Sequence, residues 1–293
     1  MNASNLFRRL CAVAALALFP LCAQAGTLWF DGGTTGIATP GDGASTATTG
    51  NWNTTATLTN WDVGAGLNHV AWNNTANGGD TAVFGGTAGP TVTVGTISVG
   101  NLTFVQTSGR VTVNSGTITL GTVNNTATID ASAMLSTSTV GASIGSAFAG
   151  TLSGGLTFIG ANNTYATYYN VVSPTRLNNL SISANSFTAS VTISNTVETS
   201  AVTTTPTGVG QNVGRQTGFG AAGNNIILNN GTIFCYLGYA GCKATNDHNI
   251  NVIGANNALN CENQADFYTF TGNLTTSSRA MHCGRLRTAA AAE

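Results

Sequence analysis

Short apolar segments alternate with Thr and Ser between Pro90 and Asp130, with a period of two residues. Each segment places Val, Ile, Leu or Phe on one face of an extended chain and hydroxyl residues on the other. Glycine separates most of the segments, as tight turns require. The pattern predicts strands at Thr91–Val94, Ile97–Val99, Leu102–Phe104, Val111–Val113, Ile118–Leu120 and Thr128–Asp130.

Similar strands recur at intervals near twenty residues. Val111 follows Val92 after 19 positions, and Ile118 follows Ile97 after 21. Strands of three or four residues are short for a sandwich, where about five or six is usual. About three short strands in each repeat are typical of one rung of a parallel β-helix. The sequence therefore predicts an all-β fold, a right-handed parallel β-helix (β-solenoid) with about 20 residues per rung.

Asparagine doublets mark the expected corners of this fold. Asn tolerates the left-handed backbone conformation of tight corners, and stacked Asn side chains form amide ladders. We interpret the doublets as turn residues rather than as ligand-binding residues. They are Asn124-Asn125, Asn162-Asn163, Asn178-Asn179, Asn224-Asn225, Asn229-Asn230 and Asn256-Asn257.

The first 25 residues predict a secretory signal peptide. Arg8 and Arg9 supply its positive start, an apolar run follows at 10–21, and Ala23-Gln24-Ala25 precedes a cleavage site before Gly26. The apolar run is too short to span a bilayer, and no other run approaches about 18 apolar residues. We therefore expect an exported mature chain without a transmembrane helix.

Charge is scarce along the whole chain. Only 6% of the residues are charged, whereas 42% are hydrophobic, a share too high for a disordered protein. Removing Arg8 and Arg9 leaves seven basic residues (9 − 2) against ten acidic ones. Nucleic acid requires a basic surface, so we expect no nucleic-acid partner. We also expect no cofactor.

These patterns divide the chain into four parts. They are the signal peptide (1–25), a Trp-containing N-terminal cap with the first rungs (26–89), the β-solenoid (90–278) and an irregular tail (279–293). Three of the seven remaining basic residues lie in the tail. This break in composition indicates either a polar cap or the truncated or frame-shifted end of a longer gene.

Several short motifs resemble bacterial passenger proteins with autotransporter-associated β-strand repeats. The first group lies in residues 26–120: Leu28-Trp29, Gly50-Asn51-Trp52, Asn60-Trp61, Gly79-Asp80-Thr81-Ala82-Val83-Phe84, the strands from Thr91 to Phe104, and Gly116-Thr117-Ile118-Thr119-Leu120. Later matches are Gly155 to Tyr165 and Asn229-Asn230-Gly231-Thr232-Ile233. The resemblance implies a parallel β-helix that is exported and displayed at the cell surface or released.

The sequence also departs from the family pattern. After Tyr165, where the family has a Gly-Gly-Thr turn, this chain has Ala166-Thr167-Tyr168-Tyr169. The family's C-terminal anchoring domain is not expected in this sequence. Association with the outer membrane is therefore expected only if such a domain belongs to a longer gene.

Four tryptophans precede the regular strands: Trp29, Trp52, Trp61 and Trp72. Terminal repeats of a solenoid must shield its core, so capping is the first interpretation. Carbohydrate contact through the indole rings is the alternative. The Gly-, Thr- and Ala-rich segment 32–50 between them is expected to be a flexible, exposed loop.

The mature chain has four cysteines, Cys235, Cys242, Cys261 and Cys283. Export makes disulfides the default. Cys235–Cys242 would close a small loop, and Cys261–Cys283 is a further candidate pair. A zinc site from Cys235, Cys242, Cys261 and His248 lacks the usual cysteine spacing, so no metal site is expected.

No catalytic residues are expected either. The carboxylates are scattered, and only Glu262 and Asp266 are near neighbours in the sequence. His69 and His248 could serve a Ser–His–Asp triad, but we expect no nucleophile elbow of the Gly-x-Ser-x-Gly type. Carboxylates from different rungs could still meet in space, as glycoside hydrolysis requires.

The sequence therefore predicts an exported, non-enzymatic β-solenoid that serves adhesion or cell-surface structure. Its expected partner is a surface ligand, either a carbohydrate or another cell. Two alternatives remain open: a polysaccharide-acting β-helix enzyme, and an ice- or mineral-binding solenoid that uses Thr-x-Thr units. These units are Thr91/Thr93, Thr117/Thr119 and Thr126/Thr128.

Overall fold

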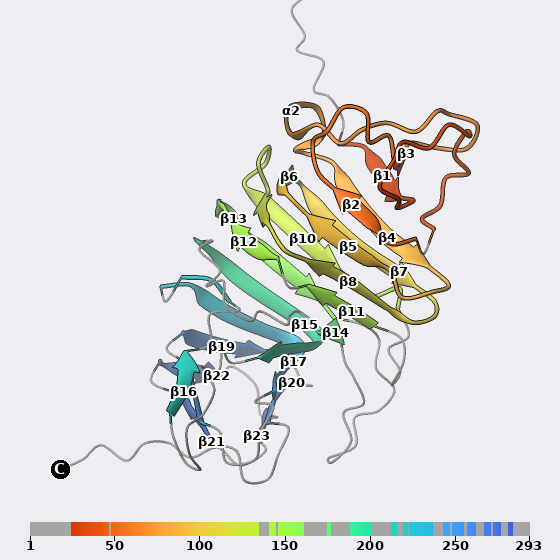
Figure 1. The fold of residues 1–293 in the computed structure, drawn as a ribbon. Coiled ribbons are helices and arrows are strands. Elements are labelled where there is room, and N and C mark those ends of the chain that lie inside the picture. The colour runs from red at the N-terminus through yellow and green to blue at the C-terminus, as the bar shows by residue number, and fades with distance from the viewer. Residues whose placement is uncertain are drawn as a thin grey trace, which may run out of the picture.

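Parallel strands from distant parts of the chain lie side by side and stack along the molecule (Figure 1). Within the described residues, the computed structural model has strands β1 to β23 and one short helix, α2 (Asn74–Asn77). None of these residues forms a helix that is long and apolar enough to cross a membrane. The structure describes residues 25–46, 48–134, 141–144, 146–160, 175–176, 188–200, 212–215, 219–221, 223–236, 243–246, 248–254, 257–261, 267–270, 272–276 and 281–283. Most of the predicted signal peptide, 1–24, lies outside these ranges.

The strands form columns, and each neighbouring pair within a column is parallel. The first column contains β1 (Thr27–Phe30), β4 (Thr81–Gly86), β7 (Asn101–Gln106), β10 (Thr126–Asp130), β13 (Thr151–Ile159), β15 (Thr188–Ser200), β17 (Asn225–Tyr236), β19 (Asn249–Ile253) and β22 (Leu274–Thr276).

A second column runs beside the first and joins it at two long strands. The early parts of β15 and β17 pair with β13 and β19, and their later parts pair with β14 and β20. The remaining strands of this column are β2 (Gly50–Trp52), β5 (Thr91–Val94), β8 (Arg110–Asn114), β11 (Gly141–Ile144), β14 (Thr175–Arg176), β20 (Asn257–Cys261) and β23 (Met281–Cys283). β23 therefore lies in the segment that was expected to be an irregular tail.

Two three-stranded parallel sheets complete the described part of the fold. The third column is β6 (Thr96–Val99), β9 (Thr117–Leu120) and β12 (Ala147–Ala149), and the fourth is β16 (Asn212–Arg215), β18 (Lys243–Asn246) and β21 (Phe267–Phe270). From β4 to β13 the chain visits the first, second and third columns in the same order three times. β3 (Trp61–Asp62) is the exception, because it pairs antiparallel to β1.

The predicted alternation of faces is confirmed between Pro90 and Asp130. Val92, Ile97, Leu102, Val111 and Ile118 are all buried in one apolar core. Thr or Ser occupies most of the intervening strand positions, which are more exposed. All six strands expected in this region are present: Thr91–Val94 has the expected bounds, and the other five extend by one or two residues at one or both ends.

The spacing between paired strands is less regular than the sequence suggests. Ile97 pairs with Ile118, as predicted, but Val92 pairs with Val113 rather than with Val111. Alternation identifies the buried face, yet a shift of two residues preserves that face, so the pattern alone misses this register. The expected spacing of about 20 also fails later in the first column, where Phe158 pairs with Ile193 after 35 positions.

Asn and Gly occupy several of the corners. Asn125 and Asn230 have φ of 51° and 52°, in the left-handed region. Gly116, between β8 and β9, has φ of 55°. A Cβ there would collide with the carbonyl oxygen of Gly95, which lies between β5 and β6. The Asn249 side chain donates to Asn225 Oδ1 at 3.3 Å, which confirms one step of an amide ladder.

Ile118 and Thr119 provide a matched test of the core. Ile118→Ala removes a fully buried side chain in β9, so we expect the free energy of unfolding to fall by about 3 kcal/mol. Thr119→Ala alters the outer face of the same strand, and its effect should stay within about 0.5 kcal/mol. Urea unfolding of both variants measures the difference. Equal losses would contradict the assignment of faces.

Candidate functional site

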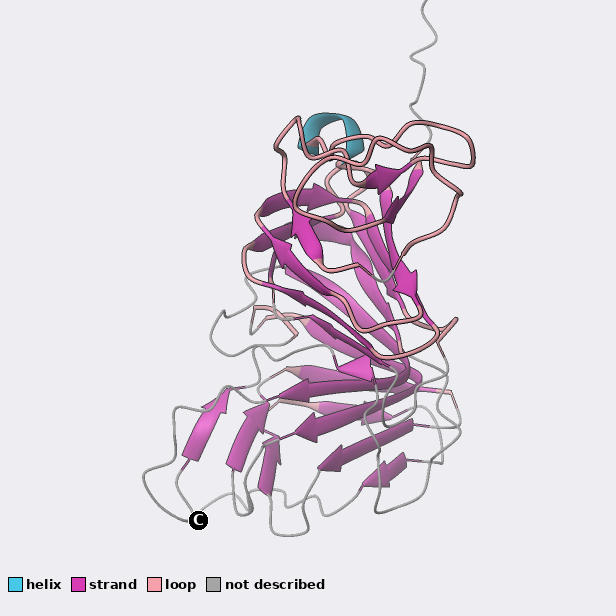
Figure 2. Cartoon of the chain, turned by 45° about the vertical axis from the view of Figure 1, so that its right-hand side comes forward, coloured by secondary structure: helices cyan, strands magenta, loops and turns pink. Residues whose placement is uncertain are grey.

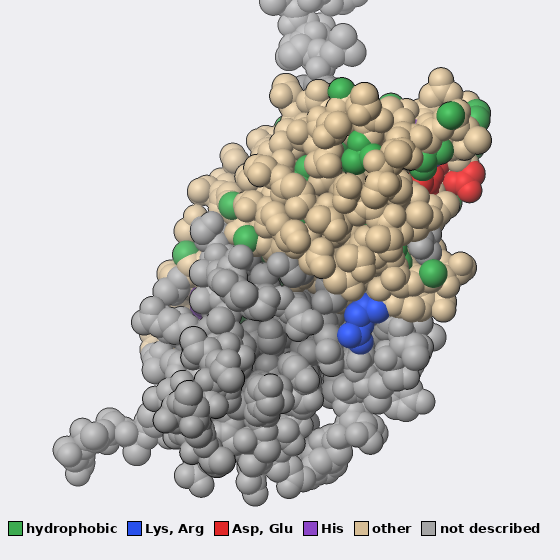
Figure 3. Space-filling model, viewed as in Figure 1, with side chains coloured by type: hydrophobic (Ala, Val, Ile, Leu, Met, Phe, Trp, Pro, Cys, Tyr) green, Lys and Arg blue, Asp and Glu red, His purple; other side chains and the backbone are tan. Residues whose placement is uncertain are grey.

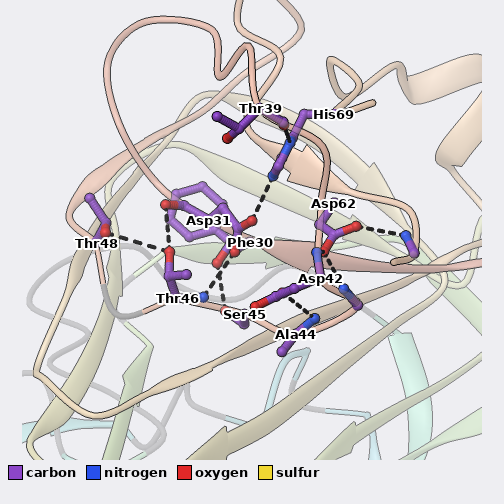
Figure 4. A network of polar contacts seen from close by, with 12 residues as sticks. Phe30, Asp31, Thr39, Asp42, Ala44, Ser45, Thr46, Thr48, Asp62 and His69 are labelled. Carbon is purple, nitrogen blue, oxygen red and sulfur yellow. Dashed lines mark hydrogen bonds and ion pairs between the residues drawn. The ribbon is translucent and has the colours of Figure 1, made fainter. Parts of the chain in front are cut away.

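Asp31, Asp62 and His69 lie together in the N-terminal loops (Figure 4). Among the described residues, they form the one group of three metal-ligating side chains whose candidate ligand atoms lie within 4.8 Å of one another. All three are buried, with exposed fractions of 8%, 0% and 8%. In a chain with so little charge, this buried group of three is the strongest candidate site among the described residues.

A small antiparallel ribbon brings the three residues together. Phe30 of β1 pairs with Trp61 of β3, and Trp61 exchanges two backbone hydrogen bonds with Val70, at 3.1 and 2.8 Å. Asp31, Asp62 and His69 are each next to one of these paired residues in the sequence. Burial of Phe30 and Trp61 in the core therefore fixes the backbone positions of the polar cluster.

Both ring nitrogens of His69 have partners. Nδ1 lies 2.9 Å from the carbonyl oxygen of Thr39, and a carbonyl can only accept, so Nδ1 carries the hydrogen. Nε2 lies 2.6 Å from Asp31 Oδ2. The ring is therefore oriented by a backbone carbonyl on one side and faces the carboxylate on the other.

Asp62 is held by backbone donors. Its Oδ2 accepts from the N–H groups of Asp42 and Gly43, at 2.8 and 2.6 Å, and its Oδ1 accepts from Gly64 at 2.6 Å. Burial alone raises the pKa of Asp62, but these three hydrogen bonds, with the nearby charge of His69, outweigh it. The pKa of Asp62 therefore lies below its ordinary value of 3.8.

The segment 32–50, expected to be a flexible loop, is anchored to this cluster. The Thr46 N–H donates to Asp31 Oδ1 at 2.9 Å, and the Thr46 hydroxyl donates to the Asp31 carbonyl at 2.8 Å. The Ser45 hydroxyl donates to the Phe30 carbonyl at 2.5 Å. Together with the bonds from Asp42 and Gly43 to Asp62, these contacts close the loop over the ribbon.

This geometry does not match either hydrolytic site considered from the sequence. His69 has the Asp31 partner of a Ser–His–Asp triad, but its second nitrogen faces a carbonyl instead of a serine hydroxyl. Asp31 and Asp62 are close enough for a pair of glycosidase carboxylates, but their burial leaves no room for a sugar. Glu262 and Asp266 lie outside the described residues.

Three of the four tryptophans are buried and pack against one another. Trp52, Trp61 and Trp72 are at most 1% exposed, and the centroids of Trp61 and Trp72 are 4.8 Å apart. Carbohydrate stacking requires an accessible ring face, so the structure contradicts that role for these three. Trp29 is partly exposed.

The structure describes the backbone of Cys235, Cys261 and Cys283. Cys242 lies outside the described residues, so the expected Cys235–Cys242 pair stays a prediction. The backbone register makes Cys235 of β17 and Cys261 of β20 direct partners on neighbouring strands. Cys283 of β23 is instead the partner of Leu259.

Analysis of the sequence missed the Asp31–Asp62–His69 cluster because its members are separated by 31 and 7 positions. One signal was present: Phe30-Asp31 and Trp61-Asp62 both place an aspartate directly after a large aromatic residue. This signal could have marked two strand ends that meet. No family model, curated protein or solved structure matches the chain.

Asp62→Asn tests the buried carboxylate. An amide cannot reproduce the charge-assisted bonds to three N–H groups, so we expect a loss of about 2 kcal/mol in the free energy of unfolding at neutral pH. The folded-state pKa is lowered, so the carboxylate's contribution is present above the unfolded value and disappears as the pH falls through the folded one. The gap between variant and wild type should therefore close below pH of about 4.

Urea unfolding at a series of pH values, in the presence of a chelator, measures this gap. Asp42→Asn is the matched control, since Asp42 is exposed and its side chain can still accept from Ala44. A gap for Asp62→Asn that does not change with pH would contradict the role of its charge.

The cysteine register leads to a separate prediction. Neighbouring parallel strands are about 4.8 Å apart, which lies within the Cα separation of about 4.4–6.8 Å that disulfides span. We therefore expect oxidised protein to contain a Cys235–Cys261 link. Peptide mapping under non-reducing conditions would identify it. A Cys235–Cys242 link would support the original expectation instead, and free thiols at both Cys235 and Cys261 would contradict the new one.

Proposed function

We propose that the chain is an exported, non-enzymatic β-solenoid of the passenger type that serves adhesion or cell-surface structure. The repeated order of the first three columns and their parallel pairing support a right-handed β-helix, in which each pass of the chain forms one rung. The resemblance of residues 26–120 to autotransporter-associated repeats supports the surface role.

The observation that carries this proposal is a row of uncharged polar side chains across successive strands. The register aligns Thr128, Thr157 and Thr192 on β10, β13 and β15, and all three are partly exposed. On the earlier strands, Asn101 donates to Thr81 Oγ1 at 3.3 Å. Such rows can form many weak hydrogen bonds to a ligand. Display of many copies raises the overall affinity above that of any single contact.

The surface composition is consistent with this role. In Figure 3, most described atoms on the face shown belong to the backbone or to side chains that are neither hydrophobic nor charged, with small scattered apolar spots and few acidic and basic groups. Catalysis depends on titratable groups within reach of a substrate. The Asp31–Asp62–His69 cluster is instead buried.

The buried tryptophans fit the capping role. Trp52 and Trp61 lie on β2 and β3, and both contact Phe84 of β4, with ring centroids 5.3 and 5.8 Å apart. Loops cover this end of the molecule next to α2 (Figure 2). We propose that these aromatic residues close the apolar core at the N-terminal end, where no preceding rung covers it.

One contact supports the expected cleavage before Gly26. The backbone nitrogen of Gly26 donates to Asp80 Oδ1 at 2.6 Å. Cleavage would turn this nitrogen into an ammonium group, and a charged donor strengthens such a bond to a carboxylate. The mature chain would then begin with its first residue tied to the loop before β4.

The ice- or mineral-binding alternative is less well supported. Thr96 and Ser98 of β6 align with Thr117 and Thr119 of β9, but the next strand presents Ala147 and Ala149 at these positions. A binding face of that class needs its hydroxyl array on many successive rungs.

Two measurements test the proposal. Protein recovered from the cell envelope or the medium should begin at Gly26 by N-terminal sequencing. Replacing Thr128, Thr157 and Thr192 together with Ala should weaken adhesion of the displayed chain to cells or to immobilised glycans by about tenfold or more, as loss of several weak contacts predicts.

Glu262→Gln with Asp266→Asn is the matched control, and adhesion should be unchanged. Cytoplasmic protein that begins at Met1 would contradict export. Turnover of a polysaccharide that this control pair abolishes would contradict the non-enzymatic role and favour the enzyme.

A further inference from the structure

We propose that Asp31, Asp62 and His69 bind a divalent transition-metal ion, with Zn²⁺ as the best match to the donor set. The ion would cross-link the β1–β3 ribbon, through Asp31 and Asp62, to His69 in the segment before Val70. This inference does not depend on the surface role proposed above.

The orientation of His69 is that of a metal ligand. Its Nδ1–H is used by the carbonyl of Thr39 at 2.9 Å, which leaves Nε2, 2.6 Å from Asp31 Oδ2, as the nitrogen that can bind an ion in place of a proton. A metal-binding histidine usually donates its second nitrogen to a carbonyl or carboxylate in this way. The ring is buried, so the site excludes bulk water.

The carboxylates are oriented by backbone donors in the same manner. Thr46 N–H binds Asp31 Oδ1 and leaves Oδ2 facing His69. The three N–H groups that bind Asp62 use three of its roughly four lone-pair positions. Each carboxylate therefore keeps acceptor capacity for an ion after its backbone bonds are made.

The charge balance favours a divalent ion. With an ion bound, His69 would be a neutral imidazole, so one divalent cation would balance the charge of −2 on the two buried carboxylates. Without a metal, the short Nε2–Oδ2 contact of 2.6 Å needs a shared proton, and the second carboxylate keeps its negative charge in a buried position.

The donor atoms match zinc better than calcium. One imidazole nitrogen and two carboxylate oxygens suit Zn²⁺, whereas Ca²⁺ takes six to eight oxygen ligands. Tetrahedral bonds of about 2.0–2.1 Å place ligand atoms about 3.3 Å apart. The candidate ligand atoms, which all lie within 4.8 Å of one another, reach this geometry by small side-chain movements, and a water molecule would fill the fourth position.

The test uses the whole purified chain, stripped with EDTA and titrated with Co²⁺ and Zn²⁺. We expect the wild type to bind one equivalent more than His69→Gln or Asp31→Asn. The variants keep the cysteines and the other histidines, so metal bound at those residues is the same in all three proteins and does not contribute to the difference. The extra Co²⁺ should show the visible absorption of a tetrahedral site, and Zn²⁺ in a hundredfold excess over Kd should raise the Tm of the wild type measurably. Asp42→Asn, beside the site, should behave as the wild type.

Equal binding by the wild type and His69→Gln would overturn the proposal. If a variant fails to fold, nitrogen NMR of the wild type decides. A metal-dependent shift of His69 Nε2 supports the site, and a ring that stays protonated at both nitrogens in excess Zn²⁺ refutes it.

Discussion

Parallel pairing between successive passes of the chain is the constraint on which the rest of the structure depends. A strand of four to six residues has no stable partner within its own pass, so its backbone groups are satisfied only by the strands before and after it. The register of that pairing also stacks Ile97 on Ile118, and Leu102 on Ile129, inside one continuous apolar core. Hydrogen bonding and core packing are therefore achieved by the same alignment.

The N-terminal end differs from the repeated strands in how its apolar core is covered. Among the described strands, β2 pairs with β5 alone, and β1 has only the two-residue antiparallel β3 opposite β4, so other residues must cover the apolar core here. The covering residues contain little regular structure and are stabilised by packed rings and by buried polar contacts. Within residues 31–80, all four aspartates accept at least one N–H group, and Asp31 and Asp62 also anchor the long loop. Charge is used here to hold irregular backbone in place.

The sequence predicted the parts of this fold that local alternation determines. Strand positions between Pro90 and Asp130, their buried face and the left-handed corners at Asn125 and Asn230 all follow from residue type within a few positions. The pairing of Val92 with Val113 does not, because registers that differ by two residues bury the same face. The lengthening of later passes was missed for a related reason, since a loop between two strands leaves the alternation of each strand unchanged.

The polar cluster was beyond sequence analysis because it depends on two pairings at once. Asp31 and His69 are 38 positions apart and meet only after β3 has paired with both β1 and Val70. The aspartates after Phe30 and Trp61 are the one local signal, and they do not indicate the pairing itself, because β3 has two residues and is antiparallel in a largely parallel fold. Polar and acidic side chains are placed differently in the regular strands and in the N-terminal segment. Between Thr91 and Asp130, most outward strand positions carry Thr, Ser or Asn, whereas four aspartates lie within residues 31–80, where much of the backbone is irregular. The Asp31–Asp62–His69 cluster is buried and hydrogen-bonded to the backbone of residues 39–46 and Gly64, so its polar groups hold irregular backbone in place at this end of the molecule.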